Sequence, residues 1–549
     1  MGGLWGIPKD SNSRFILGMS HPVDTDSLSH DDLKALVEEL LGRVSALSLT
    51  VIGLREEIAR LKGLKGRPDI KPPSRPSGME KANRPEASAG QPRRGGGPKT
   101  ANRAIDEDRI VEIPGLPPGS VFRGYEDYFV QELVLRKHVV RYRRERWLTP
   151  DGREVVAEMP AGVKGHFGPE LRRFVLGQHH QGQVTTPRLL AQLLAVGIEI
   201  SKRQLTRLLI AGPEPFLEEA REVLRAGLAN ASWVGVDDTG ARHKGRNAVC
   251  TQIGNDSFAW FGTTYSKSRV NFLECLRAGF TDYVVNDEAL AYMRAQRMPA
   301  LLVARLAADG ERSFADAETW NGHLRRLGIS ELKTNPDPTQ VATEGALLGA
   351  VLAHGFLAMA VILSDDAGQF NVLYHALCWV HAERLVHKLD AFNEAHRAAQ
   401  QAVRGKIWDF YRDLIAYKSD PSVGSKAELA ARFDAIFQQR TGFATLDKLL
   451  KRLLANKAEL LVVLDRPEIP LHNNGTENTI RDYVTKRKVS GGTRSDRGRD
   501  CRDAFLGLLK TCKKQGVKFW DYLGARLKVP NAIEVPSLPA LVKTRCAAG

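Results

Sequence analysis

The sequence predicts a multidomain α/β protein whose largest part combines a mixed sheet with many helices. Its 549 residues exceed the length of one domain, and length alone suggests roughly three or four domains. Hydrophobic residues make up 43% of the chain and charged residues 26%, as in ordinary globular proteins. Between residues 226 and 515, short apolar strand-like runs alternate with helical patterns, which predicts strands and helices packed together.

The charge balance predicts a polyanionic partner. The formal net charge is +15 and the isoelectric point is near 9.5, so binding to phosphates would be favoured by counterion release. The alternative is a protein that is merely basic. The six cysteines contain no CxxC pair, which excludes an ordinary zinc knuckle and argues against a disulfide framework. We find neither a signal peptide nor an apolar run of the roughly 18 residues that cross a bilayer, so we expect a cytoplasmic protein.

The N-terminal part is predicted to contain a dimerisation helix. After a disordered leader over 1–26, residues 27–62 carry leucines every seven positions with valine or isoleucine interleaved, which is typical of a parallel two-stranded coiled coil. An amphipathic helix packed on its own core is the alternative. Residues 63–105 are rich in Gly, Pro, Arg and Lys and are predicted to be a basic flexible linker. The repeated leucines are Leu33, Leu40, Leu47, Leu54 and Leu61.

Two small regions follow the linker. Residues 106–160 alternate like strands and predict a small β-rich module, in which the basic stripe around Arg141–Arg146 either touches DNA or is a solvated strand face. Residues 161–225 predict a helical region with a helix-turn-helix at 186–210, or an αα-hairpin without a DNA role. Its second helix should begin at a capping box formed by Ser201 and Gln204. The residues of that helix expected to bind DNA are Lys202, Arg203 and Arg207.

Two apolar strands in the largest domain each end in paired aspartates. The first, ASWVGVDDTG, ends in Asp237 and Asp238, and two further strands joined at Gly254–Asp256 should follow it. The second, FLAMAVILSDDAGQFN, ends in Asp365 and Asp366. An aspartate at the end of a buried strand has a low strand propensity and a high desolvation cost. A shared metal site explains this repeated pattern better than chance does.

A third carboxylate lies near a strongly basic segment. Glu477 is predicted to lie at the start of a helix that follows the turn 473–476. Carboxylates bind the hard Mg²⁺ ion and Lys and Arg bind phosphates, so this combination suits a site that handles phosphodiesters. Taken alone, Glu477 would be read as a surface ion pair or as a carboxylate facing the helix dipole. The basic residues expected to contact DNA here are Arg481, Lys486, Arg487, Lys488, Arg494 and Arg497, with Arg499 beside them.

Three blocks of the sequence resemble insertion-sequence 66 type transposases. They are VDDTG (236–240), DDAGQFNVLY with CWVHAERL (365–385), and NNGTEN…SGGTRSDRGRD (473–500). The resemblance implies a DDE site on a ribonuclease-H-like sheet, with Asp237, Asp365 and Glu477 as both catalytic residues and metal ligands. Mg²⁺ would be the cofactor, with Mn²⁺ as a substitute, in a two-metal site. Asp238 and Asp366 remain alternatives to their neighbours.

Two features depart from the family pattern. The family usually carries a Cys-rich zinc element before the catalytic domain, and residues 100–230 contain no cysteine, so no zinc is expected. Residues 288–355 predict a helical insertion that the pattern does not include, which leaves Asp287, after the strand-like run YVV, as a rival second aspartate.

Three further expectations concern the C-terminal half of the chain. Residues 384–465 predict a second helical insertion, and residues 516–549 a C-terminal tail. His381 is too isolated to be half of a zinc site, and it either contacts DNA or has a structural role.

The expected function is therefore that of a DNA transposase. It would bind the terminal repeats of an insertion sequence and target DNA, act as a homodimer or higher oligomer, and cut and join strands, with possible help from accessory proteins of the same element. The alternatives are a ribonuclease-H-like nuclease without strand transfer and a domesticated, non-catalytic DNA-binding regulator.

Overall fold

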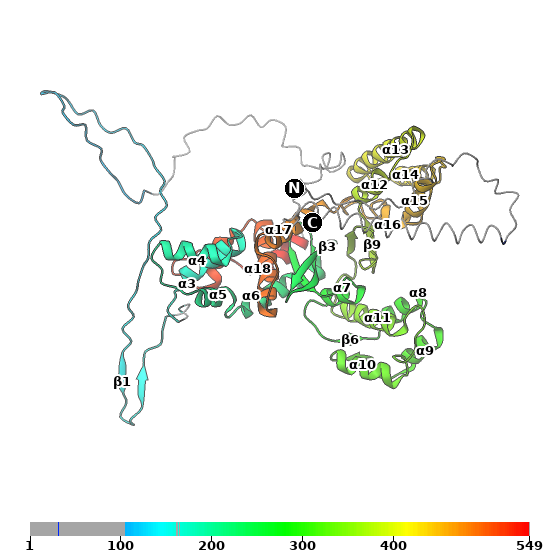
Figure 1. Cartoon of the computed structure of the whole chain (residues 1–549), viewed down its shortest axis with the longest axis horizontal. Helices are drawn as coiled ribbons and strands as arrows, with labels where there is room; N and C mark the ends of the chain where they lie inside the picture. Colours follow the sequence, from blue (N-terminus) through cyan, green and yellow to red (C-terminus); the bar gives the residue numbers. More distant parts are fainter. Residues whose placement is uncertain (1–30, 32–104, 161–162, 164, 548–549) are drawn as a thin grey trace, which may run out of the picture. The chain divides into compact units, whose positions relative to one another are not determined.

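The computed structural model describes residues 31, 105–160, 163 and 165–547. The predicted leader and coiled coil lie outside these residues except for Asp31, and so does the linker except for Ile105. The chain divides into two compact units, 1–75 and 76–549. Everything that follows concerns the described residues of the second unit (Figure 1).

A five-stranded mixed sheet forms the centre of the fold, in the order β5-β4-β3-β8-β9. β3, β4 and β5 are antiparallel, as the predicted hairpin requires, whereas β8 and β9 run parallel to β3. β3 is longer than predicted and continues through both aspartates, because β4 pairs with it as far as His243. The five strands are β3 (Trp233–His243), β4 (Arg246–Gly254), β5 (Ala259–Thr264), β8 (Val361–Ser364) and β9 (Tyr374–Leu377).

Helices cover both faces of this sheet, and alternating side chains of each strand point to opposite faces. Val234 and Val236 of β3 pack into a large core together with helices α6 (Glu214–Asn230), α7 (Arg269–Leu276) and α11 (Pro338–Ala353). Ala241 points the other way and packs with helices α17 (Asn474–Ser490) and α18 (Asp496–Lys514). Odd-numbered residues of β3 therefore face α17 and α18.

Two helical segments interrupt the sheet, close to where the sequence predicts insertions. The first follows α7 and includes the small antiparallel pair of β6 and β7, which are separated in the chain by α8 and α9. The second has its own hydrophobic core, centred on Trp379, Phe410 and Phe433. The first segment consists of β6 (Tyr283–Val284), α8 (Asp287–Ala295), α9 (Ala300–Ala308), β7 (Ser313–Phe314), α10 (Ala317–Arg326) and α11. The second consists of α12 (Trp379–His387), α13 (Glu394–Ser419), α14 (Val423–Phe437), α15 (Ala444–Ala455), α16 (Lys457–Leu460) and the 3₁₀ turn η3 (Val462–Leu464).

The region before the sheet contains the two helices predicted for 186–210. α4 (Thr186–Ala195) and α5 (Lys202–Ile210) are joined by a turn in which Gly197 has a φ of +81°. The capping box is confirmed, since Ser201 and Gln204 exchange hydrogen bonds. Leu205 and Leu208 belong to the same core as the sheet, so the predicted boundary near residue 225 is not a break in packing. The helix α3 (Pro169–Leu176) and the π-helical turn η2 (Gly177–Gln181) precede them.

Two predicted regions differ from the structure. Within 106–160 the strands are limited to β1 (Arg146–Leu148) and β2 (Glu154–Val156). Nearly all side chains of this stretch are exposed, so the alternating pattern there has no core to bury. The predicted C-terminal tail instead contains helices α19 (Phe519–Arg526) and α20 (Leu538–Ala547), which pack into the main core.

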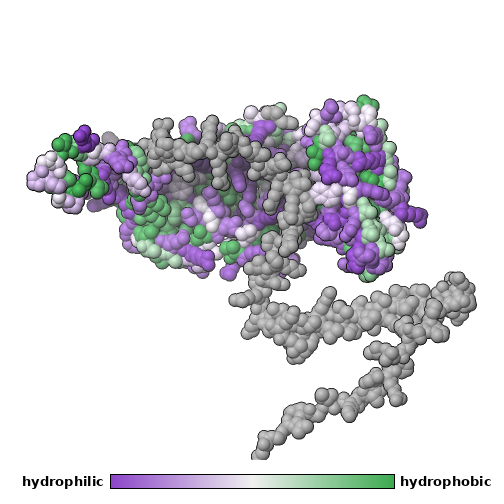
Figure 2. All heavy atoms as spheres, turned by 90° about the horizontal axis from the view of Figure 1, so that it is seen from above, coloured by the Kyte–Doolittle hydropathy of each residue, from purple (hydrophilic) through white to green (hydrophobic). Residues whose placement is uncertain are grey.

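Among the described residues, no helix is both long and apolar enough to cross a membrane. Hydrophilic residues occupy much of the face seen in Figure 2, with apolar residues interspersed among them.

Candidate active site

Asp237 lies on β3, and Asp365 directly follows the end of the neighbouring parallel strand β8, at the same level. The last paired residues of β3 and β8 are Gly235 and Leu363, and each aspartate lies two positions further on. Every second residue of a strand faces the same side of the sheet. Asp237 therefore shares the side of Ala241, which packs with α17. Leu363 packs with Trp233, which lies on that same side of β3, and Asp365 comes two positions after Leu363. The fold thus brings together two acids that are far apart in the sequence.

Helix α17 brings Glu477 to this face. The Nδ2 of Asn473, just before the helix, donates a hydrogen bond of 2.8 Å to the carbonyl of Val236, and its backbone N–H contacts the Sγ of Cys378 at 3.3 Å. A Cβ at Gly235 would lie 2.1 Å from the Oγ1 of Thr476 and 2.6 Å from the Oδ1 of Asn473. Only a glycine lets the helix begin this close to β3.

The three carboxylates influence one another. Burial, together with the negative charges of Glu477, Asp365 and Asp238, raises the pKa of Asp237 to about 7, against the opposing effect of a hydrogen bond from the backbone N–H of Asp238. That bond measures 2.7 Å. A group of acids that repel one another in this way gains stability from a bound cation.

Asp238 points to different partners from those of Asp237. Its Oδ1 lies 3.0 Å from the Nζ of Lys267, and its Oδ2 accepts a hydrogen bond of 2.7 Å from Gln369. Successive residues of a strand face opposite sides of the sheet, so the two aspartates cannot both face Glu477. This geometry favours Asp237 over Asp238 as the ligand.

The second pair of aspartates divides in the same way. Asp366 forms an ion pair with Arg452 of α15. The Oδ1 of Asp365 accepts a 3.2 Å hydrogen bond from the backbone N–H of Ala367. Behind Asp365, the hydroxyl of Ser364 lies 2.8 Å from the Nε2 of His375, whose pKa burial lowers to about 4. A neutral His375 on β9 therefore supports the end of β8.

His381 lies within the site. Its Nε2 is 3.5 Å from the Oε1 of Glu477 and 3.3 Å from an Nη of Arg384. The predicted rival, Asp287, lies elsewhere: it is exposed at the start of α8, which follows β6 of the separate two-stranded β6–β7 sheet. The geometry thus favours Asp365 as the second aspartate.

The basic residues that were predicted to contact DNA lie in different environments. Lys202, Arg203, Arg207 and Arg497 line one groove. Arg481, Lys488 and Arg494 are exposed, and Arg487 is partly buried over β3 beside Gly240.

The predicted DNA contact of Lys486 is wrong. Its side chain is 7% exposed and its ammonium group donates to the carbonyl of His179, so it is not available to DNA. Burial, together with the charge of Arg502, lowers its pKa to about 8.

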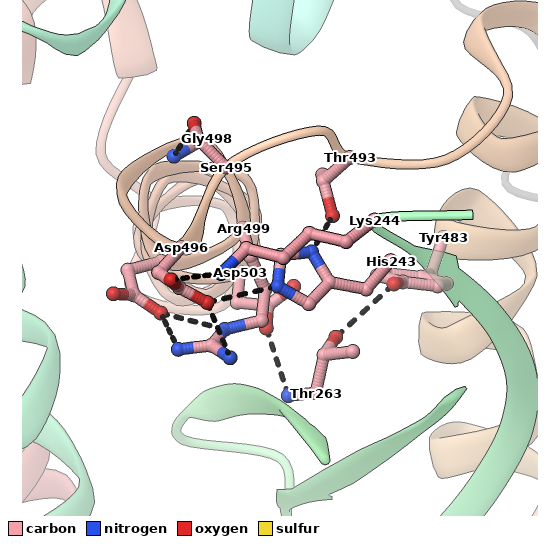
Figure 3. A network of polar contacts seen from close by, with 11 residues as sticks. His243, Lys244, Thr263, Tyr483, Thr493, Ser495, Asp496, Gly498, Arg499 and Asp503 are labelled. Carbon is pink, nitrogen blue, oxygen red and sulfur yellow. Dashed lines mark hydrogen bonds and ion pairs between the residues drawn. The ribbon is translucent and has the colours of Figure 1, made fainter. Parts of the chain in front are cut away.

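A polar network joins the far end of β3 to the start of α18 (Figure 3). The Nδ1 of His243 lies 2.8 Å from the Oγ1 of Thr493, and its Nε2 lies 2.9 Å from Asp496. Hydrogen bonds from Lys244 and His243 lower the pKa of Asp496 to about 2. Arg499 approaches the same carboxylate at 3.4 Å. The network fixes the chain between α17 and α18, where several predicted basic residues lie.

Comparison with known families adds a decisive observation. The profile of the Transposase IS66 family matches residues 164–332 and 346–500, more than half of the chain. The chain belongs to the IS66 family of transposases. An uncharacterized protein of Sinorhizobium fredii (strain NBRC 101917 / NGR234), y4jO, is 47% identical over 323 residues, which are 59% of this chain and all of that protein.

Membership of the IS66 family corrects one expectation. The helical segment 288–355 is not foreign to the family, because the family profile matches all of it except residues 333–345. The family also implies a nucleic-acid-processing enzyme with DNA as its partner and a divalent metal as its cofactor.

The acids of this IS66 transposase fit a divalent cation. The Oε1 of Glu477 is buried without a hydrogen bond. The negative charges around Asp237 repel its ionised carboxylate, and a bound cation would offset this repulsion. In the described part of the chain, one group of three potential ligands has its atoms within 4.8 Å of one another: Asp309, Glu311 and His323. Asp237, Asp365 and Glu477 are therefore spaced more widely than that. Arg326 already neutralises the Asp309 group, with an Nη 3.0 Å from Asp309.

Several residues around the site were not predicted from the sequence. Lys267, Gln369 and Arg452 contact the second aspartate of each pair. They come from three different segments of the chain. Gln369 lies within the DDAGQFNVLY block, whereas no motif marks Lys267 or Arg452, because their role depends on the tertiary contact alone.

Proposed function

We propose that this IS66 transposase cuts and rejoins DNA strands at the ends of an insertion sequence, with Asp237, Asp365 and Glu477 as the ligands of Mg²⁺ ions in a ribonuclease-H-like domain. The observation that supports the proposal is the position of Asp237 on β3 beside Asp365 at the end of the adjacent parallel strand β8, on the face to which α17 brings Glu477. The five-stranded order, with three antiparallel strands followed by two parallel ones, supports the fold assignment.

The protein's own residues have distinct parts in this chemistry. The bound ions would supply Lewis-acid activation of the attacking oxygen and stabilise the leaving oxygen. Asp237, Asp365 and Glu477 hold them. Asn473 and Gly235 hold α17 against β3, and His381 is close enough to orient Glu477. Water or a DNA 3′-hydroxyl is the nucleophile, so no covalent protein–DNA intermediate is required.

Other parts of the chain would bind and pair the DNA ends. The helices α4 and α5 support a DNA-binding helix-turn-helix, with α5 as the helix that contacts DNA. The predicted coiled coil would join two protomers so that both ends are cut together. Target DNA, accessory proteins of the element and a location on the bacterial nucleoid remain part of the proposal.

The proposal is tested by nicking of duplex DNA that carries an end of the element. We expect Mg²⁺-dependent cleavage by the wild-type protein, and its loss, by at least about a hundredfold, in Asp237→Asn, Asp365→Asn and Glu477→Gln. Asp287→Asn is the matched control and should cleave normally. Cleavage retained by any of the first three variants would remove that residue from the site. Joining of the cut end to a second DNA molecule distinguishes a transposase from a nuclease.

A further inference from the structure

A basic groove lies away from the candidate acids, between α5 and the start of α18. We call it the α5 groove. Its volume is about 660 Å³. Its four cationic side chains come from two segments of the chain that are nearly 300 residues apart. It is lined by Lys202, Arg203, Thr206, Arg207, Ile210, Ala211 and Arg497.

Helix α5 presents a rigid basic face to this groove. Leu205, Leu208 and Leu209 are buried on its other side, and the capping box at Ser201 closes its first turn. A helix fixed in this way holds its exposed residues in place. Arg203 and Arg207 lie one turn apart on the same face, about 6 Å along the axis.

Arg497 reaches the groove from the catalytic half of the chain. It is the second residue of α18, whose N-cap Ser495 accepts a hydrogen bond from the backbone N–H of Gly498. The preceding residue, Asp496, is held by His243 and Lys244, as Figure 3 shows. The start of α18 is thus anchored to β3, the strand that carries Asp237.

Glu214 forms an ion pair with one of these cations. The Nη2 of Arg497 lies 2.6 Å from the Oε1 of Glu214, at the start of α6. Both side chains are exposed, by 50% and 68%, so the ion pair is weak and exchangeable. An incoming anion can therefore replace Glu214 as the partner of Arg497.

We propose that the α5 groove binds the phosphate backbone of duplex DNA, that Arg497 supplies one of the phosphate contacts, and that Glu214 weakens the binding by competing for Arg497. The proposal rests on the proposed function, because the duplex would be the one that is cut. Guanidinium groups bind phosphate through two parallel hydrogen bonds. The DNA contacts of α5 and the catalytic sheet would then be linked through α18.

The test measures binding of a fluorescein-labelled 30-base-pair duplex of mixed sequence to the full-length protein, by anisotropy over a range of KCl concentrations. Each phosphate contact contributes about 0.9 to the slope of log K against log salt. We expect Arg207→Gln and Arg497→Gln each to lower affinity and to reduce the slope by about one. Arg325→Gln, an exposed arginine of α10, is the matched control and should bind like the wild type. Glu214→Gln should bind more tightly.

Each outcome bears on the proposal. Unchanged affinity and slope in Arg497→Gln would overturn the groove as a phosphate site, and weaker binding by Glu214→Gln would overturn the role given to Glu214. Displacement of the duplex by polyglutamate at equal charge would instead identify a site for acidic protein. The anisotropy measurement reports binding and not cleavage, so a failure to cut and a failure of the groove are observed separately. Thermal melts that match the wild type exclude misfolding as the cause.

Discussion

Neighbouring aspartates of identical chemistry acquire different environments through one property of a strand. Asp237 shares a face with Glu477, and its pKa is raised to about 7 by burial and by the other acids. Asp238 points to Lys267 and Gln369. The alternation of side chains places Asp237 on the side of the sheet where we propose the metal site, and Asp238 on the side of Lys267 and Gln369.

The raised pKa of Asp237 predicts a pH-dependent response to cations. A carboxyl whose pKa is higher in the folded state than in the unfolded state stabilises the fold at low pH and loses that contribution as pH rises toward 7. Without divalent ions, the melting temperature should therefore fall between about pH 4 and pH 7. A cation needs the ionised carboxylate, so the increase in melting temperature caused by Mg²⁺ should grow over the same range. Differential scanning fluorimetry with and without Mg²⁺ measures both.

A second buried acid provides the control for this experiment. Burial also raises the pKa of Asp503 to about 7, so it contributes to the cation-free curve in the same pH window. The Mg²⁺-dependent difference isolates the metal site. Asp237→Asn should remove most of that difference, whereas Asp503→Asn should leave it intact. An equal Mg²⁺ effect in Asp237→Asn would contradict the assignment.

For individual residues, the sequence predicted the acids of the candidate site but not the side chains that contact them. Asp237 and Glu477 could be proposed from short motifs, and the geometry favours both. Lys486 was misplaced because a lysine in a basic run gives no sign of being buried against the carbonyl of His179. Contacts such as that of Arg452 with Asp366 depend on the packing of a distant helix, which no local pattern encodes.

Among the secondary-structure elements, the docking of α17 on β3 has the greatest consequence for the site. The helix can carry Glu477 to the sheet only because Gly235 leaves room for Thr476 and Asn473. The hydrogen bond from Asn473 to Val236 fixes the contact one residue before Asp237. A small displacement of α17 would move Glu477 relative to both aspartates.

Gly235→Ala tests this contact. The added methyl group would overlap Thr476 and Asn473, so we expect a loss of stability of about 1–3 kcal/mol and a larger loss of cleavage than of DNA binding. Gly475→Ala is the control in the same helix, because a Cβ there meets nothing within 4 Å and alanine is the better helix former. A Gly235→Ala protein with normal melting and cleavage would show that the approach is not critical.

The strands were predictable where they are buried and paired. The hairpin of β4 and β5 follows the expected turn, and β8 ends directly before Asp365. The end of β3 was not predictable, because it depends on the length of β4 rather than on its own sequence. The stretch 106–160 has strand-like alternation without a sheet to join, so only β1 and β2 pair there.

For the whole molecule, the C-terminal helices belong to the main core. Leu538 and Val542 of α20 are fully buried, and the side chain of Glu219 accepts hydrogen bonds from Tyr522 and Arg526 of α19. The sequence predicts only a C-terminal tail here, because the apolar residues of this region are few and follow no long pattern. Their burial depends on α6, which lies about 300 residues earlier in the chain.

Leu538→Ala should therefore destabilise the whole protein. Truncation of a fully buried leucine costs about 2–5 kcal/mol, so we expect a clearly lower melting temperature and a loss of all activities together. Lys543→Ala, an exposed change on the same helix, should leave the melting temperature unchanged. A Leu538→Ala protein that melts normally would argue that α20 is not part of the cooperative core.

The hydrogen bond between Asn473 and Val236 also has a consequence for folding. It joins residues that are 237 positions apart, and the bonds of His243 to Thr493 and Asp496 span 250 and 253 positions. Contacts between such distant residues require the closure of very long loops and tend to form late. The acids would then meet only in molecules that have nearly completed folding. A partly folded chain would then lack the assembled acids on which the proposed cleavage depends.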